Sequence, residues 1–217
     1  MTSLLMTLGA LVMASTLVAP AAVAVQPADR PAAVPAGWEK IDGTELQALN
    51  GGTDGRHSLA AAEDAAADET YILAMQSVRN DNFVTAELNY SSPNTGALRA
   101  RSTRIGGWEN FAFEWDEGTQ TFALRSTANN LYVAVEKNYT GSSQNMLRAR
   151  STGVGSWERF ELYYSEELDR WALRSMVNGL FVAMENNYTG SLQYVLRARS
   201  ADISGSWEEF HLYDLGV

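Results

Sequence analysis

The chain contains no cysteine and only two histidines among its 217 residues. Because no disulfide can form, the fold has to rest on the burial of apolar side chains. Two histidines without cysteine also exclude most nucleophilic and zinc-binding arrangements. His57 precedes the repeated part of the chain, and His211 takes a position that Ala112 and Glu161 hold in the other repeats. We therefore expect no metal and no other cofactor.

A surplus of basic residues is also missing. The formal net charge is −10, and residues 71–217 hold 13 basic and 17 acidic side chains. Because the negatively charged phosphate backbone of a nucleic acid attracts proteins with an excess of basic side chains, nucleic-acid binding is not expected.

Residues 1–24 have the pattern of a secretory signal peptide. The stretch from Leu4 to Val18 is apolar apart from Ser, Thr and one Gly, and it is short for a membrane span. Ala22-Val23-Ala24 supplies the small residues of a cleavage site. No Lys or Arg precedes the apolar stretch, so an uncleaved anchor is the alternative. We expect a secreted, extracellular protein of bacterial type, with no membrane span after cleavage.

Residues 25–70 differ from the rest of the chain in composition. Three prolines alternate with alanines at positions 27–35, and nine acidic residues stand against three basic ones. Such a Pro/Ala-rich, acidic leader buries too little apolar surface to fold, so we expect it to be mostly disordered. Trp38-Glu39-Lys40-Ile41 within it echoes a motif of the repeats, either by coincidence or as a small docking contact.

Residues 71–217 contain one pattern three times, with tryptophans 49 and 50 residues apart. The pattern is Leu-Arg-Ala-Arg-Ser followed by Trp-Glu-x-Phe, and its middle copy runs from Leu147 to Phe160. A period of this length indicates one supersecondary unit used repeatedly. We place the units at 71–119, 120–168 and 169–217, and their total length suits a single domain.

Each unit predicts four strands. In the middle copy, residues 122–126 and 131–136 are rich in strand formers, and residues 147–151 alternate apolar and charged side chains. Phe160 opens a further segment in which alternate residues are apolar. No part of the repeats shows sustained helical periodicity. The residues that we assign to the core are Phe111, Phe160, Phe210, Leu98, Leu147 and Leu196.

Three four-stranded units restrict the architecture. A propeller normally has at least four blades, so we predict an all-β fold, a β-trefoil with pseudo-threefold symmetry, and a three-sheet β-prism is the alternative. The motifs at 129–136, 147–150 and 157–160 resemble those of fascin-like trefoils, and the resemblance covers residues 71–217. It implies a module similar to those that bind polysaccharide in secreted bacterial glycoside hydrolases. Eukaryotic fascins bundle actin with the same fold.

The repeated tryptophans are the first candidates for a carbohydrate-binding site: Trp108, Trp157 and Trp207. If the last strand of the middle unit begins at Trp157, alternation points its indole away from Phe160 and the core. A sugar ring stacks on such an indole. The alternative is that Trp157 packs under the loop at 152–156. Glu158 then points inward, where it caps backbone N–H groups or pairs with an arginine.

The loop after the second strand of each unit supplies further candidates. A carboxylate accepts bonds from two sugar hydroxyls, an amide both donates and accepts, and a tyrosine stacks or donates. The candidates are Glu87, Glu136, Glu185, Asn89, Asn138, Asn187, Tyr90, Tyr139 and Tyr188. The alternative is a hydrogen-bond network that braces the loop. We interpret the arginines of the LRARS motif as surface charges paired to glutamate, and contacts with ligand hydroxyl or phosphate groups are the alternative.

Three matched sites favour a binding module, because an enzyme usually has one deep cleft. We expect a non-catalytic, lectin-like monomer that binds polysaccharide or oligosaccharide at up to three equivalent sites. The alternative is a protein-interaction trefoil, such as a protease inhibitor or an actin-binder-like module. An inhibitor usually acts through one distinctive loop, and no loop of this sequence stands out.

Overall fold

The repeats fold into the predicted β-trefoil. The structure, a computed structural model, describes residues 33–50 and 70–216. The repeats contribute twelve strands in three units of four, as the sequence predicted. The β-prism alternative is wrong, because the strands of all three units join in one continuous sheet rather than in three separate ones.

Six strands close into a barrel. They are the first and fourth strands of each unit: β2 (Thr70–Ser77), β5 (Phe111–Asp116), β6 (Thr121–Ser126), β9 (Arg159–Ser165), β10 (Arg170–Ser175) and β13 (Phe210–Asp214). Each strand pairs antiparallel with the next in this order, and β13 pairs with β2 to close the ring. Ring closure pairs both sides of each strand over part of its length, which protects strand edges that would otherwise be open.

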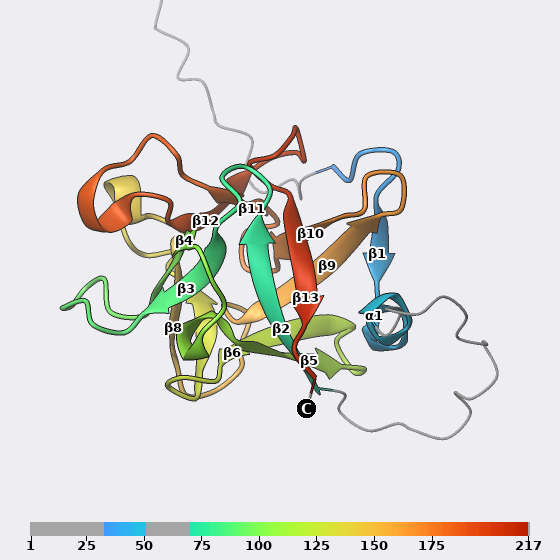
Figure 1. The fold of residues 1–217 in the computed structure, drawn as a ribbon, viewed down its shortest axis with the longest axis horizontal. Helices are drawn as coiled ribbons and strands as arrows, with labels where there is room; N and C mark the ends of the chain where they lie inside the picture. Colours follow the sequence, from blue (N-terminus) through green and yellow to red (C-terminus); the bar gives the residue numbers. More distant parts are fainter. Residues whose placement is uncertain (1–32, 51–69, 217) are drawn as a thin grey trace, which may run out of the picture.

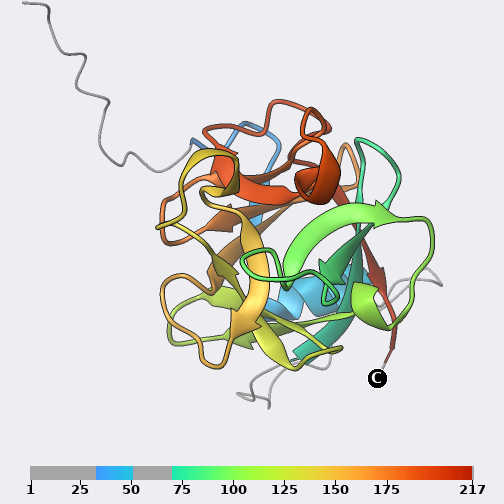
Figure 2. The same ribbon diagram turned by 90° about the vertical axis from the view of Figure 1, so that its left-hand side faces the viewer.

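The second and third strands of each unit form a hairpin, and the three hairpins cover one end of the barrel. They are β3 (Phe83–Glu87) with β4 (Ala97–Ser102), β7 (Leu131–Val135) with β8 (Leu147–Ser151), and β11 (Phe181–Met184) with β12 (Leu196–Ser200). The hairpins lie on the left in Figure 1 and surround the pseudo-threefold axis in Figure 2. Short 3₁₀ helices are η1 (Gly107–Glu109), η2 (Gly141–Ser143) and η3 (Gly190–Leu192).

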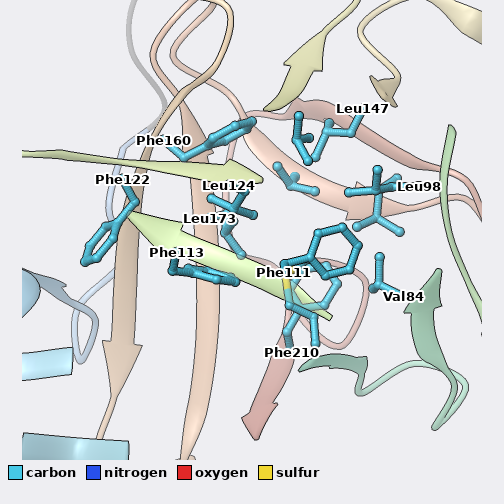
Figure 3. Packing of buried hydrophobic residues seen from close by; sticks show 14 of the residues in the cluster. Val84, Leu98, Phe111, Phe113, Phe122, Leu124, Leu147, Phe160, Leu173 and Phe210 are labelled. Atoms are coloured by element: carbon cyan, nitrogen blue, oxygen red, sulfur yellow. The ribbon is translucent and has the colours of Figure 1, made fainter. Parts of the chain in front are cut away.

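The core fills the barrel and the space under the hairpins. The residues that the sequence assigned to it are buried, with exposed fractions of 0–1%. Figure 3 shows Phe111, Phe160 and Phe210 from the three fourth strands packed with Leu98 and Leu147 from two hairpins. Strand alternation brings them to one side of the sheet, so burial of apolar side chains holds the fold without a disulfide.

Backbone hydrogen bonds join neighbouring hairpins. The N–H of Ala149 donates to the carbonyl oxygen of Gly96 at 2.8 Å, and each of the other two junctions has the equivalent bond at 3.0 Å. Gly96 has a φ of 80°, and a Cβ there would lie 2.5 Å from the carbonyl oxygen of Ala149. This junction therefore requires glycine.

A segment from the leader docks at the opposite end of the barrel, and we call residues 33–50 the N-terminal clasp. It contains β1 (Glu39–Ile41), which pairs antiparallel with β9, and helix α1 (Gly43–Asn50). Ile41 is 4% exposed and Leu46 0% exposed, and both belong to the main core. The clasp lies on the right in Figure 1, away from the hairpins.

The clasp corrects the expectation that residues 25–70 are mostly disordered, which is wrong for residues 33–50. The backbone N–H of Glu45 donates to Oδ1 of Asp42 at 2.8 Å, and the N–H of Asp42 donates to Oε2 of Glu45 at 3.0 Å. This reciprocal capping starts α1. Of the two interpretations of residues 38–41, the docking contact is confirmed.

The signal-peptide prediction and the rest of the leader fall outside the described residues. Within residues 33–50 and 70–216, no helix has the length and apolar character that a membrane crossing needs.

Candidate functional site

Each hairpin holds a network of one glutamate, two arginines and one tyrosine. In the middle repeat, Arg148 and Arg150 lie two residues apart on β8, so both side chains leave the same face of the strand. Arg148 Nη1 donates to Oε1 of Glu136 at 3.0 Å, and Arg150 Nη2 donates to Oε2 at 3.2 Å. Arg148 Nη1 also donates to the hydroxyl of Tyr139 at 2.6 Å. The carboxylate thus joins both arginines below the loop that follows β7.

The other repeats contain the same network. Its members are Glu87 with Arg99, Arg101 and Tyr90, and Glu185 with Arg197, Arg199 and Tyr188. The three glutamates are 1%, 3% and 8% exposed, which leaves their carboxylates little surface for a ligand. These contacts match the alternative interpretation, in which the glutamates belong to a hydrogen-bond network that braces the loop. The hydrogen bond to glutamate raises the pKa of Arg101 and of Arg150, so both guanidinium groups stay charged.

The first arginine of each pair also links two repeats, and we call Arg99, Arg148 and Arg197 the inner arginines. Arg148 Nε donates to the carbonyl oxygen of Thr95 in the first repeat at 2.9 Å. Arg197 makes the equivalent bond into the second repeat, and Arg99 makes it into the third, each at 2.6 Å. Each inner arginine therefore fixes the loop of the preceding repeat, and the three bonds form a closed cycle.

The second arginine of each pair reaches the surface, and we call Arg101, Arg150 and Arg199 the outer arginines. Their side chains are 44%, 36% and 51% exposed. Arg101 and Arg150 bind the glutamate through Nε and Nη2, which leaves Nη1 directed away from the carboxylate. They are surface charges paired with glutamate, as the first of the two sequence interpretations has it, and contact with a ligand is the second. Their fixed position and free N–H groups make them candidate ligand donors.

The repeated tryptophans lie beside this surface. All three are partly buried, and Trp157 precedes β9 rather than opening it. Its ring lies beneath the outer arginine, with the Arg150 guanidinium carbon 5.8 Å from the ring centre. Its neighbour Glu158 is 7% exposed and accepts a hydrogen bond from the backbone N–H of Gly155 at 2.8 Å. The capping interpretation of Glu158 is therefore confirmed.

Each repeat thus has a half-buried indole, an exposed guanidinium and an exposed loop asparagine, and in the middle repeat the guanidinium lies over the indole. Asn89, Asn138 and Asn187 are exposed, two residues after the braced glutamates. The buried glutamate and the inner arginine hold the loop and the outer arginine in place. The candidate glutamates and tyrosines therefore position the groups at the surface, whereas the candidate tryptophans and asparagines reach the surface themselves.

The surface of the third repeat has a contact from another repeat. The guanidinium of Arg79, from the turn after β2, stacks on Trp207 with its carbon 4.5 Å from the ring centre. This turn lies beside the third repeat, since the N–H of Val78 donates to the carbonyl oxygen of Glu209 at 3.1 Å. The equivalent positions in the other two turns hold Ala128 and Val177. The indole of the third repeat is thus covered by a cation from the first.

No protein-family model and no curated protein sequence matches the chain. Among solved structures, the designed threefold-symmetric protein ThreeFoil matches with a TM-score of 0.53 and 18% identity, over 67% of this chain and 99% of that one. A ricin B-like lectin of Macrolepiota procera, in complex with lactose, matches with a TM-score of 0.51 and 12% identity, over 70% and 99%.

An endo-β-galactosidase from Clostridium perfringens matches with a TM-score of 0.50 and 7% identity, over 68% of this chain and 32% of that one. Identities this low establish the fold and nothing finer. The comparisons and the strand order together define the chain as a β-trefoil protein.

Proposed function

We propose that the protein is a secreted, non-catalytic, monomeric carbohydrate-binding trefoil with up to three related sites for polysaccharide, one in each repeat. The observation that carries the proposal is that each repeat has a half-buried indole, an exposed asparagine and an exposed arginine that is held by a buried glutamate. The contacting side chains are Trp108, Trp157, Trp207, Asn89, Asn138, Asn187 and the outer arginines.

These groups suit a sugar. The indole offers an apolar face to the ring C–H groups, the guanidinium donates to hydroxyl oxygens, and the asparagine amide both donates and accepts. The fold of a lectin in complex with lactose supports the proposal as an analogy.

The contacts that the repeated glutamates make support a non-catalytic role. A glycosidase commonly needs two carboxyl groups, one to donate a proton and one to act as a base or nucleophile. The glutamates of the bracing networks bind two arginines each, and the glutamates that follow the tryptophans cap backbone N–H groups. These six side chains are therefore held in structural contacts.

A single shallow site should bind weakly. With one stacking face and two or three polar groups, we expect a dissociation constant of about 0.1–1 mM for a short oligosaccharide, or about 4–5.5 kcal/mol. A polymer that engages several sites gains avidity of about 10²–10⁴.

The test is a glycan array probed with residues 33–217, followed by titration calorimetry and a pull-down on the polymer identified. Each single Trp→Ala substitution should remove one oligosaccharide site, and the combined substitution should abolish polymer binding. The triple variant Asn89→Ala/Asn138→Ala/Asn187→Ala is the milder test, because these side chains are exposed. Glu166→Ala, exposed at the opposite end of the barrel, is the control and should leave binding unchanged.

Circular dichroism checks that each variant is folded. A folded triple tryptophan variant that binds polymer normally would make the indoles structural. An array without any bound glycan would refute carbohydrate binding and favour the protein-interaction alternative.

Secretion rests on the apolar stretch at 4–18 and the small residues at 22–24. The intact mass of protein from the culture medium should correspond to a chain that begins near Val25. A mass that retains Met1 contradicts cleavage.

A further inference from the structure

A pocket of about 220 Å³ lies on the side of the barrel, where β5, β6 and the start of β9 meet. Trp115, Ala123 and Val154 form its apolar lining. Thr70, Glu114, Asp116 and Arg159 supply its polar groups. None of these residues belongs to the repeated surfaces described above, so the pocket is a separate feature.

The polar and aromatic residues that line the pocket occur together at only one of the three pseudo-equivalent junctions between repeats. Residues 114–116 are Glu-Trp-Asp, and the residue that faces them from the next repeat is Arg159. The equivalent triplets are Tyr-Tyr-Ser at 163–165 and Tyr-Asp-Leu at 213–215, and the residues equivalent to the arginine are Glu209 and Asn110. The combination of indole, two carboxylates and a guanidinium is therefore unique to this junction.

The polar groups of the pocket have hydrogen-bonding capacity left. Asp116 accepts one bond from Arg159 at 2.8 Å and one from the backbone N–H of Thr119 at 3.0 Å, and its side chain is 40% exposed. Glu114 accepts one bond from Arg125 at 2.7 Å and one from Tyr132 at 2.8 Å. A carboxylate has about four acceptor positions, so both groups can accept more bonds. The Arg159 hydrogen bond lowers the pKa of Asp116, which keeps this acceptor ionised at neutral pH.

Both carboxylates that line the pocket are paired with a guanidinium group. Asp116 pairs with Arg159 at 2.8 Å, and Glu114 pairs with Arg125 at 2.6 Å. An anionic ligand would meet these two carboxylates, and a cationic ligand would compete with the arginines that already pair with them. A neutral ligand rich in hydroxyl groups can bond to both kinds of partner without that cost.

The volume indicates the size of the ligand. An engineered protein cavity of about 150 Å³ holds benzene. A pocket of about 220 Å³ is larger by the space that the hydroxyl groups of a six-membered sugar ring need. Trp115 is 7% exposed and lines the pocket, where it offers an apolar surface to the ring.

We propose that this pocket binds one neutral pyranose unit, as a site distinct from the three repeated surfaces. Carboxylate oxygens of Glu114 and Asp116 accept bonds from ring hydroxyls, while Arg159 and the Thr70 hydroxyl donate to others. Trp115, Ala123 and Val154 contact the C–H groups. The proposal rests on the pocket alone and stands even if the repeated surfaces bind no glycan.

Nuclear magnetic resonance of the ¹⁵N-labelled full chain can test both proposals in one titration. The indole N–H of Trp115, which donates to Glu117 at 2.8 Å, gives one of six tryptophan side-chain signals and is assigned with Trp115→Phe. The probes are D-galactose, D-glucose and D-xylose, with D-glucuronate and D-glucosamine as charged controls. At least one neutral sugar should shift the Trp115 signal saturably, at about 1–10 mM. The charged controls should bind no more tightly.

Val154→Trp fills the pocket and should weaken the response at least tenfold. Ile105→Trp places the same side chain at the equivalent, equally exposed position of the first repeat and should leave it unchanged. If Val154→Trp fails to fold, Asp116→Asn serves instead, because it removes the ionised acceptor at constant shape and should weaken binding several-fold. The tryptophans of the repeated surfaces report separately, so either proposal can fail alone.

Three results would overturn the pocket proposal. One is the absence of any Trp115 shift with the neutral sugars up to about 100 mM. Another is wild-type affinity in folded Val154→Trp. Tighter binding of a charged control would refute the neutral ligand class.

Discussion

Leu46→Ala tests the energetic role of the N-terminal clasp. Leu46 is 0% exposed and packs in the main core, although it comes from a helix outside the repeats. Truncating a buried leucine loses its transfer free energy and leaves a cavity, which together cost about 2–5 kcal/mol. For a domain of this size, 1 kcal/mol lowers the midpoint of thermal unfolding by about 2–4 °C, so we expect a decrease of about 4–20 °C. If the helix undocks instead, the loss is limited to the docking free energy of the clasp.

The assay is urea unfolding followed by far-ultraviolet circular dichroism, with thermal unfolding as a second measure. Leu49→Ala is the matched control, because Leu49 lies on the same helix and is 42% exposed. Exposed substitutions usually change stability by less than about 0.5 kcal/mol. A loss below about 1 kcal/mol for Leu46→Ala, or one equal to that of Leu49→Ala, would refute the inclusion of the clasp in the core.

Three further predictions concern the barrel and the repeated tryptophans. Phe160→Ala should cost about 3–5 kcal/mol in urea unfolding, because the side chain is fully buried, and a cost below about 1 kcal/mol would contradict its place in the core. Arg79→Ala should strengthen sugar binding at the third repeat, seen as a larger shift of the Trp207 indole signal at equal ligand, and a weakened response would make Arg79 part of the site. Ala128→Arg should cover Trp108 in the same way and reduce the response of that indole alone, whereas an unchanged response would show that such a cation does not restrict access.

The repeat period carried enough information to predict the fold. Leucine and alanine at alternate positions of LRARS indicated the buried side of β8, and Phe160 indicated that of β9, as the structure confirms. These signals are local and occur three times, so accidental patterns average out. The number of repeats then selected the trefoil over other all-β folds.

The burial of the second face of β8 was not predictable in the same way. Alternation places Arg148 opposite Leu147, and a charged side chain on that face usually indicates solvent. Arg148 is nevertheless 8% exposed, because the loop of another repeat covers it through Thr95. A contact between residues 53 positions apart leaves no local pattern, and neither does the contact of Arg79 with Trp207.

The clasp was missed for a different reason. Its contribution to the main core consists of Ile41 and Leu46, two side chains in a segment rich in acidic, proline and alanine residues. Composition averages over such a segment and indicates disorder. The capping pair Asp42 and Glu45 was the local signal that could have located the helix start.

The cycle of inner arginines determines which repeat is disturbed when one of these arginines is substituted. Because Arg148 fixes the loop of the first repeat, a substitution there should disturb a surface that the substituted repeat does not itself present. The same displacement by one repeat applies to Arg197 and Arg99. A repeat cut out on its own would therefore lack the side chain that holds its loop and would keep one that has nothing to hold. The sequence repeat has 49 residues, but a repeat has all of its loop contacts only when the three repeats are together.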